Sequence, residues 1–259
     1  TRGYCPLISS LENNFGEEKA CVEVHRANRA AGILFAGTVF RLEEGILHQL
    51  AEDNIPVVFI GNKVEALRIP YVDVDNVKGA FLATEHLIKL GHRRIGLILG
   101  PDEIPASKKR WKGYQQALEK YGLQYDERWI EQEAQLRSDP GSGYSAMMRL
   151  LERDPPAALC TFNDQYALGA IRAAVEKGLT IPQDLAVVGF DNIAAAAYYS
   201  PPLTTVEQPM LEMGKIAADM LINAIEGTLK KERSFVILDP KLIIRESCGA
   251  GPRIKQSEG

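Results

Sequence analysis

Several polar residues stand directly after apolar runs that the sequence predicts to be β-strands. Phe162, Asn163 and Asp164 follow one such run. Asp191 follows another, and Arg110 lies near the start of a predicted helix soon after a third. Open α/β sheets place ligands at the carboxyl ends of their strands, so these five residues are the first candidates for a binding site.

Two of these residues carry charges that suit a polar metabolite. The planar guanidinium fork of Arg110 matches sugar hydroxyls, a carboxylate or a phosphate. The alternative is an arginine on a solvated helix face. Asp191 can accept hydrogen bonds from two hydroxyls of a polyol, and its alternative is a turn residue after the strand.

The other three residues could also contact a ligand, and for Asp164 and Phe162 a purely structural role is the alternative. Asn163 offers both a donor and an acceptor, so it can bind a hydroxyl in either orientation. Asp164 stands where a helix needs an N-cap, so we expect either capping or ligand contact. Phe162 can stack on the apolar face of a sugar or can belong to the core.

No residue pattern predicts an enzyme, a metal site or a cofactor. The motifs G-x-S-x-G, G-x-x-x-x-G-K-[ST] and G-x-G-x-x-G are absent. The four cysteines have no C-x-x-C spacing, and the four histidines form no H-E-x-x-H motif. Asp164 and Asp191 could form an acid–base pair, but nothing in the sequence supplies a nucleophile or a metal beside them. A binding role is therefore favoured.

The charge balance argues against direct binding of nucleic acid. The 259 residues contain 30 Lys and Arg against 34 Asp and Glu, a net charge of −4. Such a chain is a poor electrostatic match for a phosphate backbone. The sequence also has no apolar run of membrane-spanning length and no secretory leader. We therefore expect a soluble, cytoplasmic protein that makes no membrane contact.

Short aliphatic runs alternate with amphipathic segments along the chain, which predicts a doubly wound α/β fold with parallel sheets. The predicted strands are 6–9, 32–36, 57–60, 71–74, 95–99, 157–161, 186–190, 204–207, 235–238 and 241–245. The predicted helices include 77–90, capped by Asp75 or Asn76, 108–121, capped by Ser107, 165–177, capped by Asp164, and 210–226.

Many ordered motifs resemble the LacI/GalR family of transcriptional regulators. They are IPVVFIG (55–61), YVDVDNVKGAFLATEHLIKLGHRRIGLILGP (71–101), SKKRWKGY (107–114), PAALCTFNDQYALGAIRAAVEKGLTIPQDLAVVGFDN (156–192), SPPLTTVEQP (200–209) and LIIRES (242–247). The resemblance covers about residues 30 to 247 and implies direct ligand contact for Arg110 and Asp191.

The resemblance also implies a periplasmic-binding-protein-like type I fold of two doubly wound lobes joined by three crossings. The N-terminal lobe would take residues 1–73 and 206–239, and the C-terminal lobe residues 74–205 and 240–249. Residues 250–259 would form a disordered tail. The chain begins where the family's second strand is expected, so the family's first strand and helix of the core are expected to be missing here.

The implied function is that of a sensing core that binds a sugar or a sugar derivative and catalyses nothing. In such regulators the core is a homodimer, and operator DNA is bound by an upstream helix-turn-helix domain that this chain does not contain. Ligand-driven lobe closure would alter operator binding. One alternative is a free-standing periplasmic sugar receptor of a transporter, which has the same fold. Another is a sugar-modifying enzyme.

Overall fold

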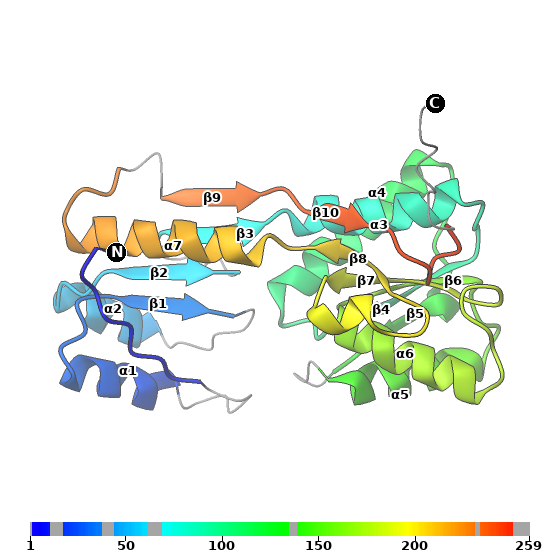
Figure 1. Ribbon diagram of the computed structural model, residues 1–259, viewed down its shortest axis with the longest axis horizontal. Helices are drawn as coiled ribbons and strands as arrows, with labels where there is room; N and C mark the ends of the chain where they lie inside the picture. The colour runs from blue at the N-terminus through cyan, green and yellow to red at the C-terminus, as the bar shows by residue number, and fades with distance from the viewer. Residues whose placement is uncertain are drawn as a thin grey trace. The chain divides into compact units, whose positions relative to one another are not determined.

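The chain forms two compact α/β units in the computed structural model (Figure 1). The structure describes residues 2–10, 18–37, 44–61, 69–134, 139–230 and 234–250. The first unit comprises Thr1–Val74 and Met210–Leu238, and the second comprises Asp75–Pro209 and Asp239–Gly259. The chain therefore passes from one unit to the other three times.

The described strands of the first unit form a parallel sheet in the order β1-β2-β3-β9. They are β1 (Ile33–Ala36), β2 (Val57–Ile60), β3 (Tyr71–Val74) and β9 (Phe235–Leu238). The helices of this unit are α1 (Glu18–Ala27), α2 (Glu44–Glu52) and α7 (Met210–Ile225).

Both faces of this sheet are covered. Val22 of α1 and Leu50 of α2 join a buried cluster around Phe59 on one face. Met213 and Met220 of α7 belong to a second cluster on the other face. Burial on both sides explains why β2 reads as an aliphatic run without alternating polar residues.

The second unit contains a six-stranded sheet in the order β10-β8-β7-β6-β4-β5, counted over the described residues. Its strands are β4 (Ile95–Leu99), β5 (Ile130–Gln132), β6 (Ala158–Thr161), β7 (Ala186–Asp191), β8 (Thr204–Glu207) and β10 (Lys241–Ile243). All neighbours are parallel except β10, which runs antiparallel to β8. Its helices are α3 (Asn76–Lys89), α4 (Pro105–Lys120), α5 (Pro140–Leu151) and α6 (Asp164–Glu176), with the short 3-10 helices η1 (Glu127–Trp129) and η2 (Ala194–Ala197).

Two closely packed helix pairs cover this sheet, α3 with α4 on one face and α5 with α6 on the other (Figure 1). Glycine allows the close approach in both pairs. A Cβ on Gly113 of α4 would lie 2.1 Å from the carbonyl oxygen of Val77 in α3. A Cβ on Gly169 of α6 would lie 1.8 Å from the carbonyl oxygen of Pro140 in α5.

The second passage between the units follows the end of β8. The sequence placed this passage between residues 205 and 206. In the structure, residues 204–207 form one strand of the six-stranded sheet, and the division falls between Pro209 and Met210. The four residues Val206, Glu207, Gln208 and Pro209, which the sequence assigned to the N-terminal lobe, therefore belong to the second unit.

The helix starts confirm one predicted cap and correct another. Asp75 caps α3, because its carboxylate accepts a hydrogen bond of 2.9 Å from the Lys78 N–H. The prediction that Ser107 caps the next helix is wrong. Helix α4 begins earlier, at Pro105, and the buried Ser107 hydroxyl donates to the Gly100 carbonyl at 2.7 Å.

The predicted strand at 6–9 is also wrong. These residues have no regular secondary structure, and Leu7 and Ile8 are 58% and 89% exposed. A strand needs a neighbour to satisfy its backbone groups, and none of the described strands pairs with this segment. The predicted tail corresponds to residues 251–259, which lie outside the described residues, together with Ala250 at its start.

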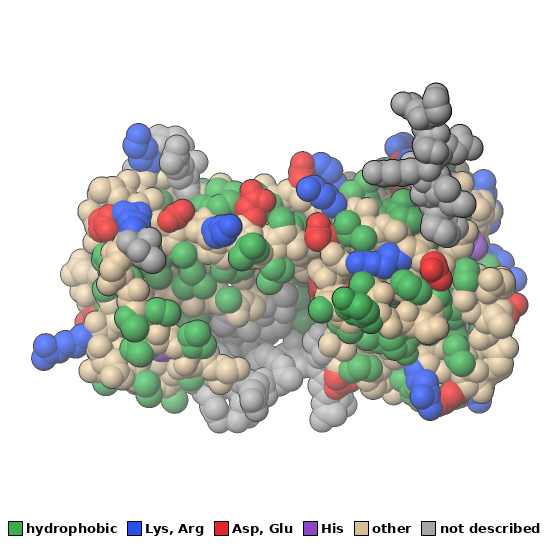
Figure 2. All heavy atoms as spheres, in the orientation of Figure 1, with side chains coloured by type: hydrophobic (Ala, Val, Ile, Leu, Met, Phe, Trp, Pro, Cys, Tyr) green, Lys and Arg blue, Asp and Glu red, His purple; other side chains and the backbone are tan. Residues whose placement is uncertain are grey.

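The face of the molecule in Figure 2 carries basic and acidic side chains next to one another, with hydrophobic side chains between them. This mixture is the usual surface of a folded domain and differs from the continuous basic stripe of a nucleic-acid-binding face. None of the helices in the described ranges is long and apolar enough to cross a membrane.

Candidate functional site

Arg110 is the centre of a polar cluster at the carboxyl ends of the strands of the second unit. Its side chain lies in the second turn of α4 and is only 4% exposed. Nε donates a hydrogen bond of 3.0 Å to Oδ1 of Asn76, and Nη1 donates to the carbonyl oxygen of Phe162. The guanidinium is therefore fixed in one orientation by two other chain segments.

Two aromatic rings contact the same guanidinium. The Arg110 Cζ atom lies 3.6 Å from the ring centre of Phe190 and 4.7 Å from that of Phe162. A cation above an aromatic face is attracted by the ring quadrupole, and the attraction strengthens where water is excluded. These contacts offset part of the free-energy cost of burying the charge. They also hold the guanidinium in one orientation, ready to donate hydrogen bonds.

Small residues behind the rings keep them in place. A Cβ on Gly79 would lie 2.7 Å from the Phe190 ring, and a Cβ on Gly100 would lie 2.9 Å from the Phe162 ring. Both rings are therefore packed directly against backbone. Phe162 is buried and its ring packs against Arg110, whereas stacking on a ligand stays a prediction.

Asp191 supplies the negative charge of the cluster. It is the last residue of β7, and its Oδ1 lies 3.9 Å from Nη2 of Arg110 and 2.6 Å from Nε2 of Gln208, which donates a hydrogen bond. Its side chain is 30% exposed. Loss of water around the carboxyl raises its pKa, and Arg110 and Gln208 oppose the increase. A partly exposed carboxylate beside a buried cation can accept hydrogen bonds from ligand hydroxyls.

Asn163 has a structural role that the sequence analysis assigned to its neighbour. Its Oδ1 accepts a hydrogen bond of 2.9 Å from the Tyr166 N–H, so Asn163 is the N-cap of α6. The prediction that Asp164 is the cap is wrong. Asn163 is nevertheless adjacent to the Phe162 carbonyl that Arg110 binds, which keeps it at the edge of the polar cluster.

Asp164 is fully buried and joins three segments of the second unit. Its Oδ2 accepts a hydrogen bond of 2.8 Å from the Ile193 N–H, and its Oδ1 accepts one from the Thr205 hydroxyl. Burial raises the pKa of this carboxyl to about 7, while the bonds from Thr205 and Ile193 act in the opposite direction. Gly189 makes room for it, because a Cβ there would lie 2.2 Å from Oδ1.

The structure adds three residues that the sequence analysis did not assign to the site: Asn76, Phe190 and Gln208. Asn76 was predicted as a candidate cap of the helix at 77–90, and Phe190 as part of a strand. Gln208 follows β8 directly, so the strand-end rule that selected Asp191 could have selected it too. The pairing of Asn76 with Arg110 joins residues 34 positions apart and leaves no local pattern.

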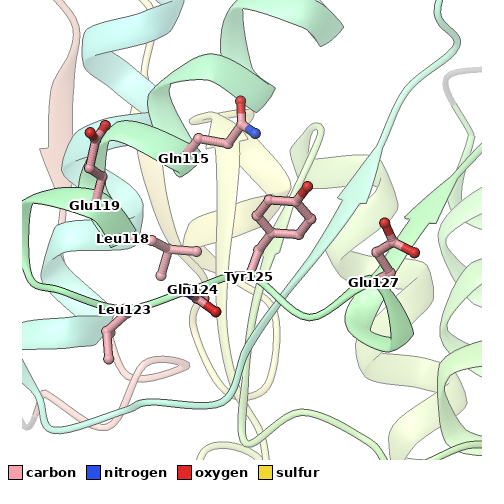
Figure 3. A pocket seen from close by; sticks show the side chains of 7 residues that line it. All are labelled: Gln115, Leu118, Glu119, Leu123, Gln124, Tyr125 and Glu127. Carbon is pink, nitrogen blue, oxygen red and sulfur yellow. The ribbon is translucent and has the colours of Figure 1, made fainter.

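A separate surface pocket of about 500 Å³ lies near the end of α4 (Figure 3). Its walls are Gln115, Leu118, Glu119, Leu123, Gln124, Tyr125 and Glu127. None of the predicted site residues is among them. The described residues also contain no group of three or more His, Cys, Asp or Glu side chains that could hold a metal ion.

Comparison with known proteins shows the family and the fold. Residues 84–248 match the family described as periplasmic binding protein-like domain. The chain is 35% identical over 246 residues to the HTH-type transcriptional regulator DegA of Bacillus subtilis, a match that covers 95% of this chain and 72% of the relative. It is also 35% identical over 252 residues to the HTH-type transcriptional repressor CytR of Escherichia coli, covering 96% and 72%.

Solved structures show the same likeness. The transcriptional regulator CelR, solved as a complex with cellobiose, superposes with a TM-score of 0.81 at 32% identity, covering 89% of this chain and 70% of that one. The two units with their three passages are thus the two lobes of a type I periplasmic-binding-protein-like fold. The chain belongs to the LacI/GalR family of transcriptional regulators and contains the ligand-sensing core.

Proposed function

We propose that this core binds a sugar or a sugar derivative at the cluster of Arg110 and Asp191, with Phe162, Asn163 and Asp164 completing or supporting the site. The observation that carries the proposal is the geometry of the charged pair. A buried guanidinium, in contact with two aromatic rings, lies 3.9 Å from a partly exposed carboxylate at the end of a strand.

Each group in the cluster matches a feature of a carbohydrate. The carboxylate accepts hydrogen bonds from hydroxyl groups, and the guanidinium donates to ring or hydroxyl oxygens or to an attached phosphate. Phe162 is only 5% exposed, and its ring supports the guanidinium that would contact the sugar. CelR, a relative with the same fold, was solved in complex with cellobiose, which supports a carbohydrate as the ligand class.

The regulatory consequence is part of the same proposal. Ligand binding would shift the balance between the open and closed states of the two lobes, with bending at the three passages. In a homodimer, that shift would change how two DNA-binding domains, encoded outside this chain, meet an operator. A coupling of about 1–3 kcal/mol would change operator affinity about 5- to 150-fold. This role implies a cytoplasmic protein.

Calorimetric titration of the purified core with a set of metabolites tests the proposal. The set comprises cellobiose, D-ribose, glucose 6-phosphate, cytidine and hypoxanthine. A probe that binds should bind at least about tenfold more weakly to Asp191→Asn, which keeps the shape of the side chain but removes its charge. Arg110→Lys keeps the charge but loses the fork, so we expect a comparable loss.

The matched control is Asp154→Asn, because Asp154 is exposed and lies before β6, at the opposite end of the sheet. Full affinity in both site variants would contradict the site. Hydrolysis or modification of a bound sugar would instead favour the sugar-modifying enzyme. A gene that encodes a secretory leader directly upstream would favour the periplasmic receptor, whereas a helix-turn-helix domain there would favour the regulator.

A further inference from the structure

The turn that carries Asp191 has an unusual backbone. Asp191 and Asn192 are consecutive and both have positive φ, 118° and 56°. A residue with a side chain rarely adopts such a conformation, and it persists only where the surrounding structure imposes it. Asp191 is also the acidic residue of the proposed site. Other parts of the structure must therefore hold the backbone of these two residues in this conformation.

Asn192 is bound on three sides. Its N–H donates to the Thr205 hydroxyl at 3.3 Å, and its Nδ2 donates to Oε1 of Glu207 at 2.9 Å. Its Oδ1 accepts a hydrogen bond of 2.7 Å from Nη2 of Arg245. The turn after β7 is therefore tied both to β8 and to the segment that follows β10.

Arg245 is itself fixed by further bonds. Its Nη1 donates to the Leu203 carbonyl at 2.7 Å, and its own N–H donates to the Thr204 hydroxyl at 2.8 Å. One guanidinium thus bridges the start of β8 and the side chain of Asn192. The bonds recorded for Asn192 and Arg245 go to these segments, whereas the Asp191 carboxylate is held by Gln208 and faces Arg110.

We propose that Asn192 and Arg245 are positioning residues for effector binding. By tying the turn to β8, they hold the Asp191 carboxylate beside the Arg110 guanidinium, although neither contacts the ligand. The inference rests on the proposed function, since it assigns these two residues a part in that same site. The alternative explanation is that the turn needs no side-chain bonds, because asparagine tolerates the left-handed backbone conformation by itself.

Asn192→Gly separates the two explanations. Glycine adopts a positive φ without strain, so this variant keeps the backbone conformation accessible but removes both side-chain bonds. The matched control is Asn54→Gly in the first unit. Asn54 has φ 57°, and its side chain makes a single local bond of 3.4 Å to the Glu52 carbonyl.

A second pair of variants tests the arginine. Arg245→Gln removes the bridge, and Arg245→Lys keeps the charge and one donor. Arg94→Gln is the control, because Arg94 also binds a side chain and a carbonyl, Asp154 and Pro155, but lies at the opposite end of the sheet, before β4.

Binding is measured by calorimetry with whichever of cellobiose, D-ribose, glucose 6-phosphate, cytidine and hypoxanthine binds the unmodified core most tightly. Asn192→Gly and Arg245→Gln should each weaken binding about three- to tenfold, the loss expected for one hydrogen bond. Arg245→Lys should recover part of the loss, and the two control variants should bind within about twofold of the unmodified core.

A second measurement needs no ligand. Carbon NMR titration of the Asp191 carboxyl follows its pKa, which desolvation raises in this structure. In Asn192→Gly the Asp191 carboxyl should change both its exposure to water and its distance from Arg110, so its pKa should differ from that in the unmodified core, while Asn54→Gly should leave it unchanged.

The two measurements separate this inference from the proposed function. If no probe binds the unmodified core, the assignment of ligand class fails, and the titration alone decides the positioning role. An Asp191 titration in Asn192→Gly that matches the unmodified core overturns that role, as does unchanged affinity in both Asn192→Gly and Arg245→Gln.

Discussion

The burial of Asp164 makes the stability of the second unit depend on pH. Its carboxyl has a pKa of about 7 in the folded chain, against an ordinary aspartate value of 3.8. Between these two values the folded chain keeps a proton that the unfolded chain has lost. The contribution of Asp164 to the free energy of unfolding should therefore be largest near pH 4, decrease as the pH rises to about 7, and level off above it.

Asp164→Asn tests this expectation. Asparagine keeps the shape but cannot titrate, so the difference in the free energy of unfolding between the two proteins should change by up to about 1.4 kcal/mol per pH unit below about pH 7. Urea unfolding at about pH 5, 6, 7 and 8 measures it. The matched control is Asp219→Asn, because Asp219 is exposed on α7. A constant difference for Asp164→Asn would contradict the buried, protonated carboxyl.

Some roles of the site residues could be predicted from the sequence, and others could not. Asp191 was correctly expected at the end of a strand and Arg110 near the start of the helix after another strand, because the aliphatic runs mark where the strands end. The cap of α6 was placed one residue late, because asparagine and aspartate are both good caps. Bonds from Thr205 and Ile193, distant in sequence, engage Asp164 and leave the capping role to Asn163. Local patterns do not record such partners.

At the scale of elements, the contact of α5 with α6 depends on the absence of side chains. Gly169→Ala would place a methyl group 1.8 Å from the Pro140 carbonyl oxygen and force the two helices apart. We expect a loss of about 2–4 kcal/mol in the free energy of unfolding, since close-packed helices resist added volume. Chemical denaturation followed by circular dichroism measures the change.

Gly214→Ala in α7 is the matched control, because nothing lies within 4 Å of the Cβ it would add. Alanine there should raise the free energy of unfolding by about 0.5–1 kcal/mol, through its better helix propensity. If the two substitutions had similar effects, tight packing of α5 against α6 would not be the reason that Gly169 is needed.

Elements were predictable from the sequence where burial was complete. The strands β4, β6 and β7 are buried along almost their whole length, and each was read as an aliphatic run. β5 was missed because it has only three residues, includes Glu131 and lies at the edge of the sheet. The run at 6–9 has the composition of a strand, but a strand also requires a neighbour, which composition does not encode.

At the scale of the whole molecule, the two units should differ in local stability. The central strands β4, β6 and β7 are sealed between two helix pairs, whereas in the first unit β9 alternates exposed and partly buried residues. A local unfolding event that exposes β9 to water therefore exposes less buried apolar surface than one that exposes β6. Amide exchange followed by mass spectrometry should therefore be faster in β9 than in β6. Equal protection of the two strands would contradict a difference between the units.

The route of the chain has a consequence for its synthesis. β9 lies at the edge of the first sheet, and Ser247 ties the second, since its hydroxyl donates to the Val187 carbonyl and accepts from the Thr204 N–H. β9 and the segment around Ser247 are synthesised after β3, β7 and β8, the strands that they contact. A nascent chain that has reached residue 230 would therefore still present two incomplete sheets, and its need for chaperone protection lasts until these late segments have emerged.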